Sequence, residues 1–347
     1  MINLAPILAK LIISLISFNK YCLLLRIPIT MIQIDNANQL PENFLTRLPE
    51  QGIIQVDGEQ RISYLQGQVT ADMQDLSAQH SLLGCHCDFK GKAWNVFYAA
   101  QFGESALLIS HKESLMASFA QLQKYAVFAK VTLSHSEDWV CLAGAGEKLE
   151  SLIEERFAQL PVGDRQTVSN DQGLVMAIDA PRNRYMLVLT SEAAQSLVDN
   201  YSQELADASL WEVLDIQAGI PQLQQATSNE FVPQMMNVQA LEGISFNKGC
   251  YMGQEVVART KFLGKNKRAA FILKAEQAAS VVPGDSLESP AGENWRRGGT
   301  VLRAAQLNAQ TWLLAVVPND TVVGSVMRLK SHPDSVFTVQ PLPYSLA

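Results

Sequence analysis

The sequence changes character near residue 263, and this change constrains the fold more than any other feature. Downstream of Gly264 there are only short strand-like runs, separated by turn residues such as those at 283–285 and 318–320. The runs cover residues 269–274, 299–304, 311–317, 323–329 and 336–339. Several short strands at close spacing are typical of a small barrel or sandwich. We therefore expect residues 264–347 to form a C-terminal β-barrel domain.

Upstream of this boundary, strand and helix patterns alternate with short, hairpin-like links. Residues 83–99 predict two strands joined by a turn at Lys90-Gly91. Helical periodicity covers residues 112–125, 146–160, 192–207 and 209–218. Short links favour antiparallel layers, so we expect residues 41–263 to form an α+β region.

The first forty residues carry no signal of an ordered fold. Lys10 and Lys20 bound an uncharged run at 11–19, which is too short for a bilayer that needs about 20 apolar residues. The run is similar to a signal-peptide core, but no small-residue cleavage site follows it. We expect residues 1–40 to be an unstructured or mis-called extension, with Met31 as the true start.

Charge and cysteine content limit the class of protein. The chain of 347 residues has 27 basic and 34 acidic side chains, a net charge of −7. This argues against a surface that binds nucleic acid as a whole, so any polyanion site must be a local basic patch. Five irregularly spaced cysteines favour a reducing cytoplasm over a disulfide framework. In a strand, Cys85 and Cys87 would lie opposite His86, so we expect no metal site there.

One segment, residues 244–260 (ISFNKGCYMGQEVVART), differs from the ordinary strands and helices around it. A helix-compatible pattern begins after Gly253, which places Glu255 in the first turn, where a carboxylate complements the helix dipole. Cys250 would lie just ahead of this helix and near Lys248, and both features favour a thiolate. The thiol is therefore either reactive or ligand-contacting, or it is a small buried hydrophobe that precedes a helix.

Two further features suggest a ligand site near the domain boundary. Basic residues cluster around the segment: Lys248, Arg259, Lys261, Lys265, Lys267 and Arg268. Such a cluster is either a solvated face or a site for carboxylates or phosphates. Trp211 can stack on a flat heterocycle, although an anchor in the core on an amphipathic helix is the simpler interpretation.

The run Lys248-Gly249-Cys250-Tyr251-x-Gly253-Gln254-Glu255 resembles the signature of the YgfZ family, folate-binding proteins related to the aminomethyltransferase (T-protein, GcvT) of the glycine cleavage system. Further matching segments follow in order from about residue 45 to the C-terminus. They are residues 65–72 (LQGQVTAD), 86–88 (HCD), 90–92 (KGK), 124–128 (KYAVF), 233–234 (PQ), 244–246 (ISF), 292–297 (GENWRR) and 341–346 (PLPYSL). The sequence is most similar to the bacterial, tRNA-modifying branch.

This resemblance implies a GcvT-like, three-domain ring around a folate channel, with residues 41–263 forming two intertwined subdomains. It implies tetrahydrofolate or another folate derivative as cofactor, and a role in supporting iron–sulfur enzymes, including those that thiolate tRNA. Cys250 and Lys248 are the candidate catalytic residues. The candidate folate-binding residues are Trp211, Gln217, Gln234, Tyr251, Gln254, Glu255 and Arg259.

Three departures from the relatives affect these expectations. The carboxylate that aminomethyl transfer uses is replaced at Asn95-Val96, so we do not expect that reaction. Gln217 stands where relatives often have a glutamate, and an amide accepts through one oxygen only. A tryptophan that relatives can carry near Gln51 is absent.

Three hypotheses follow from the sequence. The first is a folate-binding accessory protein for iron–sulfur cluster enzymes and thereby for tRNA modification. The second is a folate-dependent one-carbon transferase or demethylase that uses Cys250. The third is a module that binds RNA or an iron–sulfur protein through the basic cluster, although the net charge predicts no stable nucleic-acid binding. We expect the protein to be cytoplasmic, without membrane partners.

Overall fold

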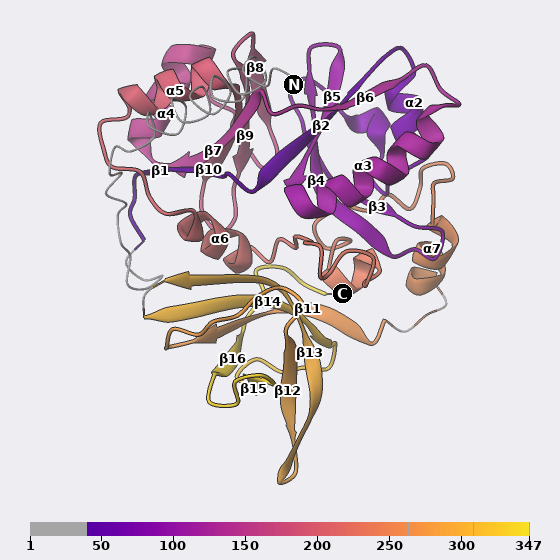
Figure 1. Cartoon of the computed structure of the whole chain (residues 1–347), viewed down its shortest axis with the longest axis vertical. Coiled ribbons are helices and arrows are strands. Elements are labelled where there is room, and N and C mark those ends of the chain that lie inside the picture. Colours follow the sequence, from indigo (N-terminus) through magenta and orange to yellow (C-terminus); the bar gives the residue numbers. More distant parts are fainter. Residues whose placement is uncertain (1–39, 263, 265, 308, 347) are drawn as a thin grey trace, which may run out of the picture.

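The computed structural model describes residues 40–262, 264, 266–307 and 309–346. It contains two antiparallel sheets with helices on their outer faces, and below them a β-barrel (Figure 1). The expectation for residues 1–40 falls almost entirely outside the described residues. No helix in the described part of the chain is long and apolar enough to cross a membrane.

The first sheet has the strand order β3-β4-β5-β2-β6. Its strands are β3 (Leu82–Cys87), β4 (Ala93–Phe102), β5 (Ser105–His111), β2 (Gln51–Asp57) and β6 (Thr132–His135). Helix α3 (Lys112–Ala126) packs on this sheet through Leu115 and Leu122, which lie on one face of the helix. Helix α2 (Arg61–Gln66) and the 3-10 turn η2 (Met73–Asp75) complete this unit.

The second sheet has the order β1-β7-β10-β9-β8. Its strands are β1 (Phe44–Arg47), β7 (Trp139–Ala145), β10 (Arg184–Thr190), β9 (Gly173–Ile178) and β8 (Thr167–Asn170). Helices α4 (Glu147–Phe157) and α5 (Ser191–Asn200) cover one face. The helix expected over 192–207 ends at Asn200, because Tyr201 is extended and buried and Ala206 bonds to the β1 backbone at Leu45.

One hydrophobic core joins all three parts of the molecule. It contains Ile109 of the first sheet, Met186 of the second sheet and Leu314 of the barrel. Helix α6 (Ala208–Gln217) contributes Trp211 and Leu214 and lies between the sheets and the barrel (Figure 1). Burying apolar surface from each part in one core stabilises their arrangement.

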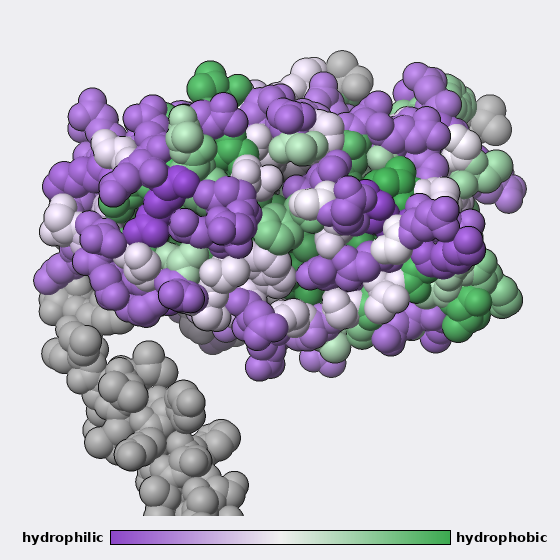
Figure 2. Space-filling view, turned by 90° about the horizontal axis from the view of Figure 1, so that it is seen from above, coloured by the Kyte–Doolittle hydropathy of each residue, from purple (hydrophilic) through white to green (hydrophobic). Residues whose placement is uncertain are grey.

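The C-terminal region is a closed antiparallel barrel with the order β11-β14-β13-β12-β15-β16. Its strands are β11 (Arg268–Ala275), β14 (Gln310–Pro318), β13 (Asn294–Leu307), β12 (Ser286–Ala291), β15 (Val326–Leu329) and β16 (Val336–Gln340). The expected fold class, antiparallel α+β layers followed by a small β-barrel, is confirmed. The face opposite the barrel is mostly hydrophilic, with apolar side chains in small groups (Figure 2).

Candidate functional site

Three segments that carry the sequence signature meet in space. The loop at 244–253, called the signature loop below, is bonded to the 65–72 segment. Ser245 N–H donates to Thr70 O (2.9 Å), and Met252 N–H donates to Gly67 O (3.2 Å). The β3–β4 turn contacts the same loop at its far end. The structure therefore brings together residues that are more than 150 positions apart in the chain.

The buried side chain of Lys248 holds this loop against the 65–72 segment. Its ammonium donates hydrogen bonds to the carbonyl oxygens of Val69 (2.8 Å) and Ala71 (2.6 Å), and the side chain is buried. Burial lowers the pKa of Lys248 to about 8, because the nearby charge of Asp72 only partly offsets the loss of solvent. These hydrogen bonds give Lys248 a structural role in addition to the catalytic role that remains a prediction.

Two glycines allow the turn and the loop to touch. Gly253 has φ +81°, and a Cβ there would lie 2.4 Å from Asp88 O. Gly91, in the β3–β4 turn, has φ +72°, and its Cβ would lie 2.9 Å from the Cβ of Val256. Both positions need a left-handed backbone and a bare Cα, which only glycine supplies without strain.

Cys250 lies on the exposed side of this loop as a free thiol. Helix α7 (Gln254–Phe262) begins four residues later, as the sequence predicts. Glu255 is exposed in its first turn and Arg259 is exposed in its last turn, while Gln254 is half-buried. Tyr251 is buried, and its pKa is raised by burial and by the nearby Cys87 and Cys85.

Two clefts lie where the three parts of the molecule meet. The barrel cleft, of about 710 Å³, lies between the loop at 234–246, helix α7 and the barrel. The sheet cleft, of about 370 Å³, lies between the two sheets, the end of α6 and the C-terminal segment at 343–344. Glu242 lines both clefts, so they are neighbours. Cys250 is not among the described residues that line either of them.

Buried amides line the barrel cleft. Gln234, in the 3-10 turn η3 (Pro233–Met236), donates from Nε2 to Val257 O at 2.6 Å, which ties the turn to α7. The Oε1 atoms of Gln234 and Gln239 are buried and lack a partner in the described structure. On the same wall, Lys261 Nζ lies 3.7 Å from the centroid of the Phe246 ring. A ligand with N–H donors could bond to the two free amide oxygens, and an anionic end of the ligand could pair with Lys261.

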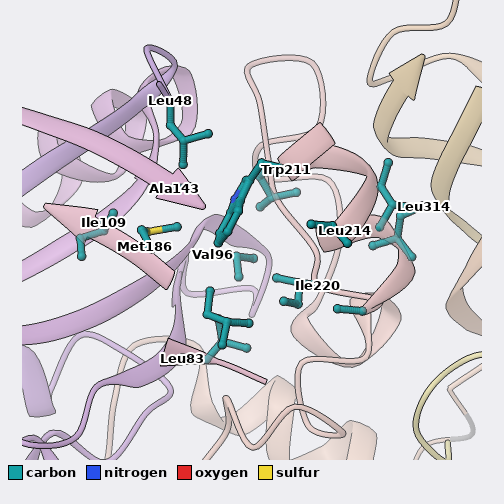
Figure 3. Close-up of a cluster of buried hydrophobic side chains, with 14 of the residues drawn as sticks. Leu48, Leu83, Val96, Ile109, Ala143, Met186, Trp211, Leu214, Ile220 and Leu314 are labelled. Carbon is teal, nitrogen blue, oxygen red and sulfur yellow. The ribbon is translucent and has the colours of Figure 1, made fainter. Parts of the chain in front are cut away.

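Trp211 lies inside the core. Its ring is 0% exposed and packs among Leu48, Val96 and Met186 (Figure 3). The guanidinium of Arg184 lies 4.1 Å from the ring centroid. A ligand could stack on Trp211 only if neighbouring side chains moved. Gln217 is half-buried at the end of α6, and folate contacts of both residues remain predictions.

A buried cluster of charged side chains was not predicted from the sequence. Asp215 of α6 pairs with Arg184 of β10 (2.7 Å) and Arg303 of β13 (2.8 Å), and Arg303 also pairs with Glu212 (2.6 Å). Burial alone would lower the pKa of Arg303, but Glu212 and Asp215 outweigh it and raise that pKa. A charged residue at the start of an apolar strand (position 184) or within one (position 303) was the available signal. This α6 cluster (Arg184, Glu212, Asp215 and Arg303) joins the second sheet, α6 and the barrel.

Asn95, where the sequence comparison predicts that a carboxylate is replaced, is held as a neutral amide. It is fully buried, its Nδ2 donates to Ser110 Oγ (2.8 Å), and its Oδ1 accepts from Ser114 Oγ (2.8 Å). The amide is therefore satisfied as a neutral group and supplies no charge. On the neighbouring strand, His86 is buried against Ser118 Oγ (2.9 Å), and burial lowers its pKa to about 4.

The basic cluster of the sequence is divided in the fold. Lys248 is buried, whereas Arg259, Lys261 and Lys267 are exposed. Lys265 lies outside the described residues. The exposed members are available to an anionic ligand, and Lys261 is the one that also lines the barrel cleft.

Comparison with known sequences identifies the family. The chain is 41% identical to the tRNA-modifying protein YgfZ of Pectobacterium carotovorum over 305 residues, which is 87% of this chain and 92% of the relative. It is 40% identical to the tRNA-modifying protein YgfZ of Yersinia enterocolitica over 313 residues, 89% and 94% of the two chains. This protein belongs to the YgfZ family. The family description "YgfZ, beta-barrel domain" matches residues 266–332, within the barrel of this YgfZ-family chain.

The fold has a solved counterpart. The crystal structure of glycine cleavage system aminomethyltransferase T from Bartonella henselae superposes with a TM-score of 0.68, covering 87% of this chain and 86% of that one. The identity is 16%, so the likeness establishes the shared fold. The YgfZ-family membership and the GcvT-like fold expected from the sequence are thus confirmed.

Proposed function

We propose that this YgfZ-family protein binds tetrahydrofolate or another folate derivative in the clefts where its three parts meet. The observation that carries the proposal is the pair of adjoining clefts in a fold shared with an aminomethyltransferase. Sites for small molecules commonly occupy about 300–1,000 Å³ at junctions between domains. Clefts of about 710 and 370 Å³ suit a ligand of this size.

The residues of the barrel cleft fit a folate chemically. A pterin presents N–H donors, and Gln234 and Gln239 each offer a buried amide oxygen without a partner. Lys261 would attract the carboxylates of the glutamate tail. The folate would supply a one-carbon carrier, and these side chains would bind and orient it.

Calorimetric titration with tetrahydrofolate tests the proposal. Gln239→Leu removes one acceptor, and losing a hydrogen bond worth about 1 kcal/mol weakens binding roughly fivefold. Gln123→Leu, on the exposed surface of α3, is the matched control and should bind like the parent protein. Absence of saturable binding by the parent protein would overturn the proposal.

We further propose that folate binding serves iron–sulfur enzymes, including those that thiolate tRNA. The curated relatives are named tRNA-modifying proteins, which supports the link to tRNA. The four described cysteines are free thiols, which suits the reducing cytoplasm as the compartment.

Cys250 is the residue through which we expect the cellular function to act. A strain that lacks the protein, complemented with Cys250→Ala, should show the low thiolated-tRNA level of the deletion strain by mass spectrometry. Asn247→Ala, exposed in the same loop, is the matched control and should restore the level. Full restoration by Cys250→Ala would remove the thiol from the functional centre.

A second candidate function is a folate-dependent one-carbon transferase or demethylase. The free, exposed thiol of Cys250 in the signature loop favours it. Following the one-carbon group after incubation with methylated or formylated folates distinguishes the two. Turnover that Cys250→Ser abolishes would favour the enzyme over the accessory protein. The neutral, fully bonded Asn95 leaves aminomethyl transfer without its carboxylate.

A further inference from the structure

A two-stranded arm projects from the barrel, away from the two sheets (Figure 1). We define the arm as residues 288–297, the outer part of the β12–β13 hairpin. The register pairs Glu288 with Arg297 and Pro290 with Trp295. Gly292 turns the chain at the tip with φ +64°. Since directly opposed residues share a face of the ribbon, Trp295, Glu288 and Arg297 lie on one face.

A guanidinium supports the tryptophan of the arm. Arg328 of β15 lies opposite Glu288 in the register, and its Cζ is 4.2 Å from the centroid of the Trp295 ring. Glu288 Oε2 accepts from Arg328 Nε at 2.9 Å, which fixes the guanidinium against the ring. Trp295 is half-buried, so the residue remains partly accessible to solvent. The arm thus carries an aromatic platform whose orientation is set by an ion pair.

Cationic side chains lie on both faces of the arm and at its base. Arg296 and Arg297 are exposed and form no ion pair with any described residue, and Lys330 is exposed at the end of β15. The nearby acids are Glu288, which pairs with Arg328, Glu293 at the tip, and Asp285, which adjoins Ser286 where the Lys330 N–H is bonded. With Arg328 included, there are four cations and three carboxylates. In a chain of net charge −7, this is a local basic patch of the kind that a polyanion requires.

We propose that the arm binds unpaired RNA, with a base stacked on Trp295, one phosphate held by Arg297 on the same face of the ribbon, and a further phosphate held by Arg296, which projects from the opposite face. Exposed aromatic rings between cationic side chains are how proteins bind single strands, because every base offers a π-face and every nucleotide a phosphate. An acidic peptide would use the arginines but has no need of a flat ring backed by a guanidinium. The net charge of −7 argues against RNA binding by the whole surface. Binding by the arm is compatible with it, because only one small element would contact the RNA.

This site is separate from the proposed folate clefts. None of the residues that define the platform lines either cleft. Folate binding and RNA binding can therefore succeed or fail independently, and tetrahydrofolate titration of the arm variants should match that of the parent protein.

Fluorescence anisotropy with a labelled twelve-nucleotide oligouridylate tests the proposal on the full-length protein. Trp295→Ala should weaken binding roughly tenfold or more, as expected when one stacked base is lost, without changing the salt dependence. Trp295→Phe keeps a π-face and should restore most of the affinity. Phe128→Ala removes a ring that is 85% exposed on the α+β region and serves as the matched control.

The double variant Arg296→Gln/Arg297→Gln tests the phosphate contacts. The slope of log affinity against log salt should decrease by roughly 1.4, because each cation on a single strand contributes about 0.7. The matched control is Lys112→Gln/Lys148→Gln, which removes two exposed charges far from the arm. Thermal unfolding of each variant shows whether the barrel is intact.

Two results would overturn the proposal. One is no binding of the oligonucleotide at low salt by the intact protein. The other is binding that Trp295→Ala does not weaken and that polyglutamate of equal charge displaces as well as RNA does. The second result would assign the arm to acidic protein segments instead.

Discussion

The signature loop and the α6 cluster both bury positive charge, but they compensate it differently. At Lys248 the partners are two carbonyl dipoles, which replace only part of the lost hydration, and the pKa falls to about 8. At Arg303 the partners are two carboxylates, which raise the pKa of the arginine. The loop therefore holds a proton that can leave near physiological pH, whereas the cluster keeps its charge. Carboxylate partners therefore preserve a buried charge, whereas carbonyl dipoles support it only in part.

The largest expected effect concerns the α6 cluster. Asp215→Ala leaves Arg184 and Arg303 without the carboxylate that they share. Leaving a buried charge without its partner costs about 3–5 kcal/mol of the free energy of unfolding. Urea unfolding of the variant and the parent protein measures the loss. A loss below 1 kcal/mol would mean that carboxylates stabilise a buried cation in this protein no more than carbonyl dipoles do.

The next effect concerns the backbone of the signature loop. Gly253→Ala forces a Cβ to 2.4 Å from Asp88 O at a positive φ, so the loop and the β3–β4 turn must separate. Strained backbone of this kind costs roughly 1–3 kcal/mol. Gly249→Ala is the matched control in the same loop, because its Cβ would meet nothing within 4 Å. Equal stability of the two variants would contradict the contact described here.

A pH effect distinguishes the two regions directly. The pKa of Lys248 is lower in the folded chain (about 8) than its ordinary value of 10.5, so the unfolded chain binds more protons between these values. Stability from this group therefore rises as pH increases through that window, by at most about 1.4 kcal/mol per pH unit. The difference in unfolding free energy between the parent protein and Lys248→Met should grow from pH 7 to 9.5. Lys124→Met, exposed on α3, is the control variant, and a constant difference for Lys248→Met would refute the lowered pKa.

The smallest effect is expected at an exposed ion pair. Lys130 and Glu59 lie 3.1 Å apart, and both side chains are more than 70% exposed. Because solvent screens such pairs, Glu59→Gln should change the free energy of unfolding by about 0–1 kcal/mol. The same urea titration measures it. If Glu59→Gln lowered the free energy of unfolding as much as Asp215→Ala, burial could not explain why the α6 cluster stabilises the protein more than an exposed ion pair.

Long, regular patterns made much of the fold predictable. The Lys90-Gly91 turn, the helix over 112–125 and most of the strands after Gly264 lie where the sequence predicts them. The strand expected over 323–329 is shorter and begins at Val326, because Val323 and Gly324 form a turn. Strand β1 was missed because four residues carry too little pattern, and β12 was missed because its sequence SLESPA is polar and contains a proline. Helix α5 ends early because tertiary hydrogen bonds pull the following residues toward β1.

By itself, the sequence determined the family and the fold class, since family signatures and hydrophobic periodicity are local properties of the chain. It also located the loop around Cys250 and supplied candidate folate-binding residues, whose contacts with a folate remain a prediction. Only the tertiary structure decided that Lys248 bonds to the carbonyls of Val69 and Ala71 and that Trp211 is buried under Arg184. Burial and charge pairing depend on residues far apart in the chain, and no spacing along a single sequence specifies which of them meet.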